Sequence, residues 1–222
     1  MHYGGNKLAT NHLEQLVQIP IDPIKLEGSL ALPVQIQALV VFAHGSGSSR
    51  FSSRNNFVAR VLREEGFGTL LMDLLTEEED EVYQTRFNID LLTERLLLAT
   101  RWLQEQSRTK DLMIGYFGAS TGAAAALKAA ASAGLKKIGA VVSRGGRPDL
   151  AKEALVHVQS PTLLIVGGND DIVIELNREA YAKLKGKKQL VIVPGATHLF
   201  EEPGTLEEVA RLATDWFKQY LI

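Results

Sequence analysis

The chain has 222 residues, 45% of them hydrophobic, which is enough to bury one sizeable core. A net charge of −2 and an isoelectric point near 6.2 give no reason to expect nucleic acid or a membrane as partner. The absence of cysteine excludes a disulfide framework, a thiolate metal site and a cysteine nucleophile.

The ends and the spacing of the sequence favour a simple organisation. Residues 1–7 lack the apolar core of a signal peptide, and no apolar run approaches the length of a membrane span. We therefore expect a cytoplasmic protein. Because we find no repeat, low-complexity tract or long linker, we expect a single domain over residues 1–222.

The first part of the chain predicts three strands and a helix. Runs at 13–19 and 24–32 are separated by two prolines, which break pairing, so we expect an antiparallel pair at a sheet edge. The run 38–43 is continuously apolar, which is typical of a strand buried on both faces. Ser53 can cap a helix that ends at Gly66.

The middle of the chain continues the alternation. We expect a strand at 68–72, followed by a solvated acidic loop at 76–81 without a function. Apolar residues spaced three and four apart predict a helix over 89–103. A strand at 112–118 then leads into an alanine-rich helical run at 123–133.

The last third predicts three more strands, at 138–142, 161–166 and 189–193, and a final helix opened by Thr205 and Glu208 in capping-box spacing. Apolar strands alternating with amphipathic helices indicate an α/β protein with a doubly wound, mostly parallel sheet and helices on both faces. In such sheets ligands bind at the carboxyl ends of the strands. The segment between the first and second of these strands is too short for a cap domain, so we expect an open site.

The motif Gly118-Ala119-Ser120-Thr121-Gly122 joins a strand to a helix. Glycines on both sides of the serine allow a tight turn between closely packed elements, and the helix N-terminus points free N–H groups at it. This pattern predicts that Ser120 is a nucleophile. The alternative is that Ser120 only caps the following helix.

A serine nucleophile needs a base and an acid, and both candidates follow strands. His198 follows the last strand and would take the proton of Ser120, because imidazole titrates near neutral pH. Asp170 follows the preceding strand and would orient the imidazole. The competing residues are His44 for the base and Asp171 for the acid.

Two further sets of residues lie at the same strand ends. The backbone N–H groups of Ser46 and Thr121 could form an oxyanion hole. Arg144 and Arg147 could bind an anionic part of a substrate such as a carboxylate, or could instead pair with the acidic loop or with Asp149.

The chain resembles the α/β-hydrolase superfamily, and within it the dienelactone hydrolase-like group of small serine hydrolases. The resemblance covers nearly the whole chain. The segments that carry it are HGSGSSR at 44–50, GASTG at 118–122, GGNDDIV at 167–173 and PGATHLF at 194–200.

The resemblance implies an eight-stranded sheet with the second strand antiparallel, a triad without metal or cofactor, and hydrolysis of esters or lactones. It also favours Asp170 over Asp171, and it implies that His44 orders its loop by hydrogen bonds. Better-known members often use a cysteine nucleophile, whereas this chain has Ser120. The resemblance therefore implies ester hydrolysis without implying dienelactone as substrate.

The sequence thus predicts a hydrolase of a small ester or lactone that acts through an acyl-enzyme on Ser120. An acyltransferase with the same residues, and a hydrolase fold retained for binding alone, are the alternatives. The two glycine-rich loops lack the spacing of phosphate-binding and dinucleotide-binding motifs. The natural substrate and the oligomeric state do not follow from the sequence.

Overall fold

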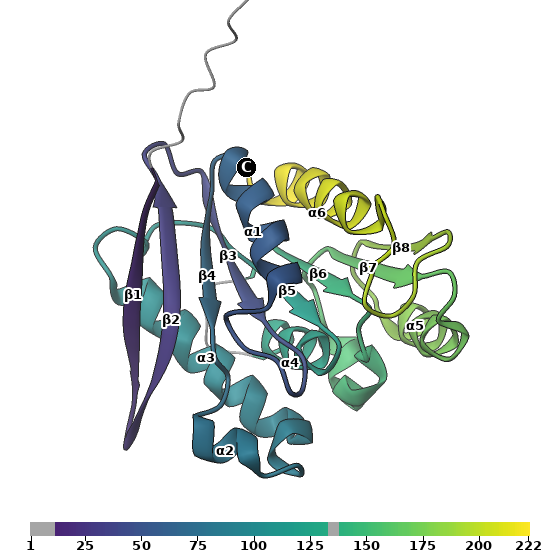
Figure 1. Cartoon of the computed structure of the whole chain (residues 1–222), viewed down its shortest axis with the longest axis horizontal. Helices are drawn as coiled ribbons and strands as arrows, with labels where there is room; N and C mark the ends of the chain where they lie inside the picture. The colour runs from purple at the N-terminus through teal and green to yellow at the C-terminus, as the bar shows by residue number, and fades with distance from the viewer. Residues whose placement is uncertain (1–11, 133–137) are drawn as a thin grey trace, which may run out of the picture.

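The computed structural model describes residues 12–132 and 138–222, and its centre is an eight-stranded sheet in the order β1-β2-β4-β3-β5-β6-β7-β8 (Figure 1). The strands are β1 (His12–Ile21), β2 (Ile24–Pro33), β3 (Ala38–Ala43), β4 (Phe67–Met72), β5 (Ile114–Ala119), β6 (Ala140–Arg144), β7 (Thr162–Gly167) and β8 (Lys188–Val193). The helices are α1 (Ser53–Glu64), α2 (Glu77–Glu81), α3 (Ile89–Glu105), α4 (Thr121–Ala130), α5 (Asp171–Lys183) and α6 (Thr205–Leu221), with 3-10 turns η1 (Thr85–Phe87) and η2 (Pro148–His157).

The sheet is parallel except at one edge. Strand β2 runs antiparallel to both β1 and β4, while strands β3 to β8 run parallel to one another. The predicted antiparallel edge pair and the predicted mostly parallel sheet are therefore confirmed. This arrangement, with helices on both sides, is the α/β-hydrolase fold.

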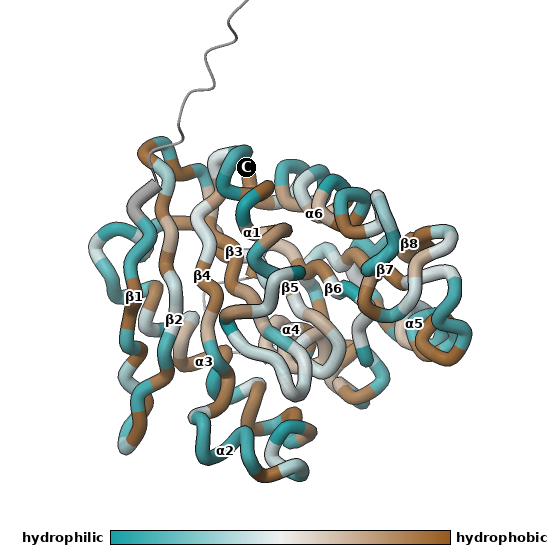
Figure 2. Tube along the Cα trace, in the orientation of Figure 1, coloured by the Kyte–Doolittle hydropathy of each residue, from teal (hydrophilic) through white to brown (hydrophobic). Residues whose placement is uncertain are grey.

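Helices cover both faces of the sheet, as the continuously apolar strands require. Helices α1 and α6 pack on one face, and α3, α4 and α5 pack on the other (Figure 1). Every residue of β3 and β5 is buried. In Figure 2 the apolar colour runs along these strands and along the inner sides of the helices.

The chain order of the strands creates a crevice at the carboxyl edge. Strand β3 lies between β4 and β5, so the connections that leave β3 and β5 diverge to opposite faces. Such a point is where open α/β sheets bind ligands. The loop after β3 carries His44, and the turn after β5 carries Ser120.

Several predicted boundaries are wrong in detail. The predicted acidic loop contains a short helix, α2, because Thr76 and Glu79 form a capping box. The predicted capping box of α6 is absent: Gly204 is the N-cap, and the Thr205 hydroxyl donates to the Glu202 carbonyl. Ser52, rather than Ser53, caps α1. The predicted helix end at residue 133 lies outside the described residues.

The connection from β6 to β7 is short and holds only η2, so this segment adds no cap domain over the carboxyl edge. Within residues 12–132 and 138–222, no helix has the length and apolarity to cross a membrane.

Candidate active site

Ser120 stands at the sharp turn between β5 and α4, with backbone angles φ 50° and ψ −122°. A positive φ is costly for a residue with a side chain and persists only where the surroundings enforce it. The Ser120 N–H donates to the Arg144 carbonyl at 3.3 Å, and the Arg147 N–H donates to the Ser120 carbonyl at 3.0 Å. These two bonds tie the turn to the end of β6.

The glycines on either side of Ser120 are required by close packing. A Cβ on Gly118 would lie 2.4 Å from the Cα of Ala123, and one on Gly122 would lie 2.1 Å from the Ala43 carbonyl oxygen. Both obstacles are backbone atoms, which cannot move aside cheaply. The Ser120 side chain makes no capping bond to α4 and is partly exposed, so its hydroxyl is available for chemistry.

His198 and Asp170 are in contact although 28 residues separate them: Nδ1 of His198 lies 2.7 Å from Oδ2 of Asp170. Asp170 is the N-cap residue of α5 but makes no capping bond, so its carboxylate is directed to the imidazole instead. A carboxylate only accepts hydrogen bonds, so Nδ1 carries the proton. In the neutral ring the lone pair is then on Nε2, which makes no hydrogen bond among the described residues.

The imidazole lies close to the loop after β6, which begins next to the strand end that binds the Ser120 N–H. A Cβ on Gly145 would lie 3.6 Å from the His198 ring carbon Cε1, and Gly145 directly follows the residue that binds the Ser120 N–H. Among the described residues, no hydrogen bond joins the Ser120 hydroxyl to His198. Catalytic hydrogen bonds are often long before substrate binds, so this geometry is compatible with proton transfer in a complex.

His44 cannot serve as the base, because both of its ring nitrogens are occupied. The Leu74 N–H donates to Nε2 at 3.0 Å, and Nδ1 lies 2.9 Å from the Gly45 carbonyl oxygen, to which it donates. The ring is 6% exposed. Burial lowers the pKa of His44 and so keeps it neutral.

The expected oxyanion-hole residues are in contact with each other. The Ser46 N–H donates to the hydroxyl of Thr121 at 2.9 Å, across 75 residues of sequence. Thr121 is the first residue of α4, where backbone N–H groups have no partner within the helix. The Thr121 N–H thus has no partner within α4, whereas the Ser46 N–H has a side-chain acceptor.

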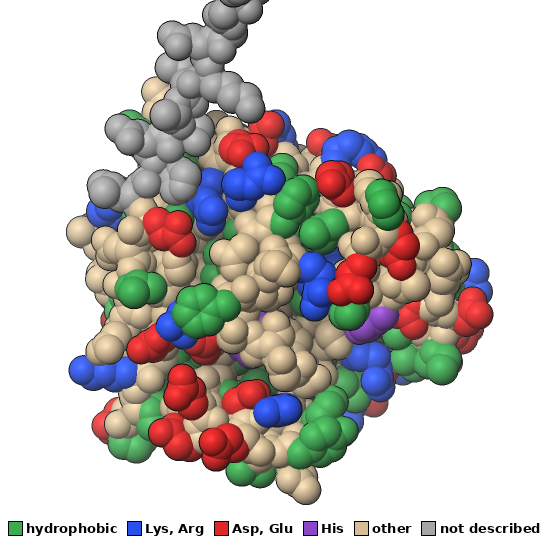
Figure 3. Space-filling view, in the orientation of Figure 1, with side chains coloured by type: hydrophobic (Ala, Val, Ile, Leu, Met, Phe, Trp, Pro, Cys, Tyr) green, Lys and Arg blue, Asp and Glu red, His purple; other side chains and the backbone are tan. Residues whose placement is uncertain are grey.

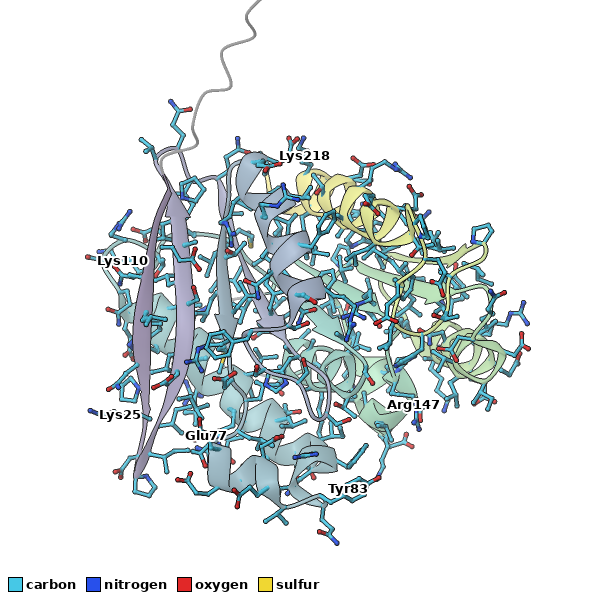
Figure 4. All side chains as sticks on the ribbon, in the orientation of Figure 1. Lys25, Glu77, Tyr83, Lys110, Arg147 and Lys218 are labelled. Carbon is cyan, nitrogen blue, oxygen red and sulfur yellow. The ribbon has the colours of Figure 1, made fainter. Side chains whose placement is uncertain are left out.

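Arg144, at the end of β6, and Arg147, in the loop that follows, differ in their hydrogen-bond partners. Arg147 forms a two-pronged ion pair with Asp149, with bonds of 2.9 and 2.8 Å, which is the structural alternative considered above. In Figure 4 Arg147 lies at the rim of the molecule, beside η2.

Arg144 is 6% exposed, and its guanidinium is bonded to the amide oxygen of Asn55 at 3.2 Å and lies over the Phe200 ring. Among the described residues it has no carboxylate partner, and its Nε has no hydrogen-bond acceptor. Burial lowers the pKa of Arg144 to about 10, and the charge of Arg54 acts in the same direction. That Asn55 and Phe200 contact Arg144 was not predicted from the sequence: Asn55 lies outside the motifs quoted above, and Phe200 lies within the 194–200 segment without a role assigned to it.

A cleft of about 730 Å³ opens between α2 and the loop after β3. Its lining includes His44, Arg50 and Phe51, but none of Ser120, Asp170 and His198, so the candidate triad does not line this cleft. Lys25 and Glu77 lie at one end of it (Figure 4). Acidic side chains gather over α2 below this hollow (Figure 3).

In the described part of the chain, no group of three or more metal-ligating side chains is arranged to hold a metal ion.

The fold and these strand-end loops define an α/β hydrolase. The dienelactone hydrolase family model matches residues 26–221, and the chain belongs to this family. A crystal structure of a dienelactone hydrolase from Anabaena variabilis is 53% identical, with a TM-score of 0.91 over 95% of this chain and 99% of that one. The esterase Est1E from Butyrivibrio proteoclasticus, at 18% identity and a TM-score of 0.78, covers 92% of this chain and 98% of its own and shares the fold.

Two Mycobacterium tuberculosis relatives are 57% identical over 208 residues and carry a provisional name as phosphoribosyl transferases. The match covers 94% of this chain but 47% of the relatives, so the chain spans about half of their length.

Proposed function

We propose that this hydrolase cleaves a small carboxylic ester or lactone through an acyl-enzyme on Ser120, with His198 as general base and Asp170 as its orienting acid. The observation that carries the proposal is the 2.7 Å contact between His198 and Asp170, formed beside a strained turn that exposes the Ser120 hydroxyl. The contact fixes the tautomer in which Nε2 can accept a proton.

In the first half of the reaction, Oγ of Ser120 bonds to the ester carbonyl carbon while its proton passes to Nε2 of His198. The carbonyl electron pair moves to the oxygen, which becomes an oxyanion. As the intermediate collapses, the bond to the leaving oxygen breaks and that oxygen takes the proton from Nε2. Asp170 stabilises the imidazolium that exists between these two transfers.

In the second half, water takes the place of the alcohol. His198 removes a proton from the water as the water oxygen bonds to the acyl carbon, which gives a second tetrahedral intermediate. As this intermediate collapses, the bond from the acyl carbon to Oγ of Ser120 breaks, Oγ takes the proton from Nε2, and the carboxylic acid is released. The short connection over η2 leaves the site open to water, which favours hydrolysis over transfer of the acyl group to another alcohol or amine.

We also infer that the substrate carries an anionic group near the acyl carbon, recognised by Arg144. A buried cation without a counter-ion is costly, and a ligand carboxylate would offset that cost. Arg144 pairs with Ala119 in the sheet, next to the nucleophile. Arg147 is already neutralised by Asp149 and is not needed for this role.

The phosphoribosyl transferase name belongs to relatives about twice as long as this chain. The residues gathered at the carboxyl edge here provide a nucleophile, a base and an acid. These groups support acyl chemistry in the part of the relatives that matches this chain, independently of the function of their remaining residues.

The replacement Ser120→Ala tests the proposal. We expect turnover of p-nitrophenyl acetate to fall on the order of 10⁶-fold, to background, with an unchanged thermal unfolding midpoint. Undiminished turnover in a folded variant would refute the serine mechanism. A fluorophosphonate probe that fails to label folded wild-type protein would favour the alternative of a binding protein without turnover.

A second comparison tests the anion site. We expect Arg144→Gln to lower kcat/KM for a hemisuccinate ester roughly 10-fold to 100-fold more than for a neutral ester of the same alcohol, since a charged hydrogen bond is worth about 1.5–3 kcal/mol. Arg144→Lys retains the charge, so comparing it with Arg144→Gln separates the loss of the charge from a folding defect. Arg147→Gln is the control and should leave the ratio unchanged; equal losses on both esters in Arg144→Gln would contradict the inference.

A further inference from the structure

The hydroxyl of Thr121 has an unused hydrogen beside the nucleophile. Its oxygen accepts the Ser46 N–H at 2.9 Å, and within the described ranges no acceptor is found for the hydroxyl hydrogen itself. Thr121 is 2% exposed. A buried donor without an acceptor is uncommon and costs free energy, so a hydroxyl hydrogen left free here calls for an explanation.

The position of Thr121 supplies that explanation. It directly follows Ser120, and its side chain bridges to the loop after β3. That loop approaches Ser120 so closely that a Cβ on Gly45 would lie 2.9 Å from the Ser120 Cβ and 3.7 Å from its Oγ. The contact between Thr121 and Ser46 therefore lies close to Ser120, between the two residues from which the sequence predicts the oxyanion hole.

Because the Thr121 hydroxyl accepts a hydrogen bond from the Ser46 N–H, it is a better donor than an isolated hydroxyl. A hydroxyl that accepts a bond from an amide is polarised and donates more strongly in turn. The hydroxyl can rotate about its Cβ–Oγ bond toward a new acceptor, whereas the Ser46 amide is held on Thr121. The positive end of α4 adds a favourable field for an anion.

We propose that the Thr121 hydroxyl donates directly to the oxyanion, and that the Ser46 amide acts through it. This inference rests on the proposed serine mechanism and assigns its oxyanion hole a side-chain donor beside the backbone N–H of Thr121. It departs from the sequence-based expectation that the Ser46 N–H donates directly. The proton stays on Thr121 throughout; only its hydrogen bond strengthens as negative charge develops on the carbonyl oxygen.

The test compares Thr121→Val, which keeps the shape and removes the hydroxyl, with Thr121→Ser, which keeps the hydroxyl. We expect Thr121→Val to lower kcat for p-nitrophenyl acetate by roughly 10²-fold to 10³-fold with little change in KM, as for loss of one oxyanion donor. Thr121→Ser should stay within a few-fold of wild type. The control is Thr214→Val, which removes a buried hydroxyl from α6, away from the site, and should retain wild-type kcat.

Binding of a trifluoromethyl ketone gives a readout that a structural defect would not mimic, because its adduct with Ser120 carries an oxyanion. Its affinity should fall in Thr121→Val in proportion to kcat/KM. If Thr121→Val does not fold, the pair Thr121→Ser and Thr121→Ala, which differ by one oxygen, serves instead with the same expectation.

Two outcomes separate the possible failures. If wild type turns over esters and Thr121→Val retains its kcat, the freed Ser46 amide is the donor and the inference is overturned. If wild type neither turns over esters nor reacts with a fluorophosphonate, the serine mechanism itself fails.

Discussion

Two strand-end loops of this hydrolase each carry a histidine, and the two histidines differ in what they can do. His44, after β3, is buried, and both of its ring nitrogens are bonded to backbone groups. His198, after β8, has a side chain 39% exposed, and within the described ranges only its Nδ1 is hydrogen-bonded, to Asp170. A free nitrogen lone pair is what a base requires.

The difference shows how one residue type can be held for structure in one loop and left available for the proposed chemistry in another. The bonds of His44 hold the loop after β3 against the start of the loop after β4, and thereby position Gly45 against Ser120. The bond of His198 orients the ring without using its second nitrogen. Hydrogen-bond occupancy, rather than position in the sheet, separates the two roles.

The largest expected effect is loss of the proposed base. His198→Ala should lower kcat/KM for p-nitrophenyl acetate on the order of 10⁶-fold, because Ser120 then has no proton acceptor. Steady-state kinetics with circular dichroism as a folding check measures this. Retention of most activity would mean that another group takes the proton.

A smaller effect is expected from the acid. Asp170→Asn should lower kcat by about 10⁴-fold, because an amide that donates to Nδ1 forces the proton onto Nε2 and removes the base. Asp171→Asn is the matched control, since Asp171 is exposed and begins α5. Equal losses in the two variants would contradict the assignment of Asp170.

The smallest effect concerns His44 and is on stability. Burial lowers the pKa of folded His44, so the unfolded chain binds the proton more readily. The contribution of neutral His44 to the free energy of unfolding is complete above the unfolded pKa of about 6.5. It is lost as the pH falls from there toward the lower pKa of folded His44, by at most about 1.4 kcal/mol per pH unit.

Urea unfolding of wild type and His44→Gln at pH 7.5 and 5.5 measures this contribution. Wild type should lose more of its free energy of unfolding between the two values than the variant. Identical losses would show that His44 binds protons equally in both states.

The mostly parallel sheet with helices on both faces was predictable because apolar runs such as 38–43 must be covered on both faces. The ends of the helices were harder to predict. The capping box of Thr76 and Glu79 lies within an acidic stretch whose charges suggest a solvated loop, and Thr205 with Glu208 shows the right spacing without the geometry.

Within the site, the contact between His198 and Asp170 was predictable, because both follow neighbouring parallel strands. The bond between Ser46 and Thr121 was not, because it joins a backbone N–H to a side chain from a distant part of the chain. The burial of Arg144 without a carboxylate partner was not predictable either. Its guanidinium is bonded to Asn55, and the position of Asn55 is set by how α1 packs.

The measurement that tests the central claim most directly is the rate at which a fluorophosphonate labels Ser120 in wild type, His198→Ala and His44→Gln, with the site of labelling read by mass spectrometry. We predict rapid labelling at Ser120 in wild type, comparable labelling in His44→Gln, and nearly complete loss in His198→Ala. Labelling that survives in folded His198→Ala but disappears in folded His44→Gln would contradict the account.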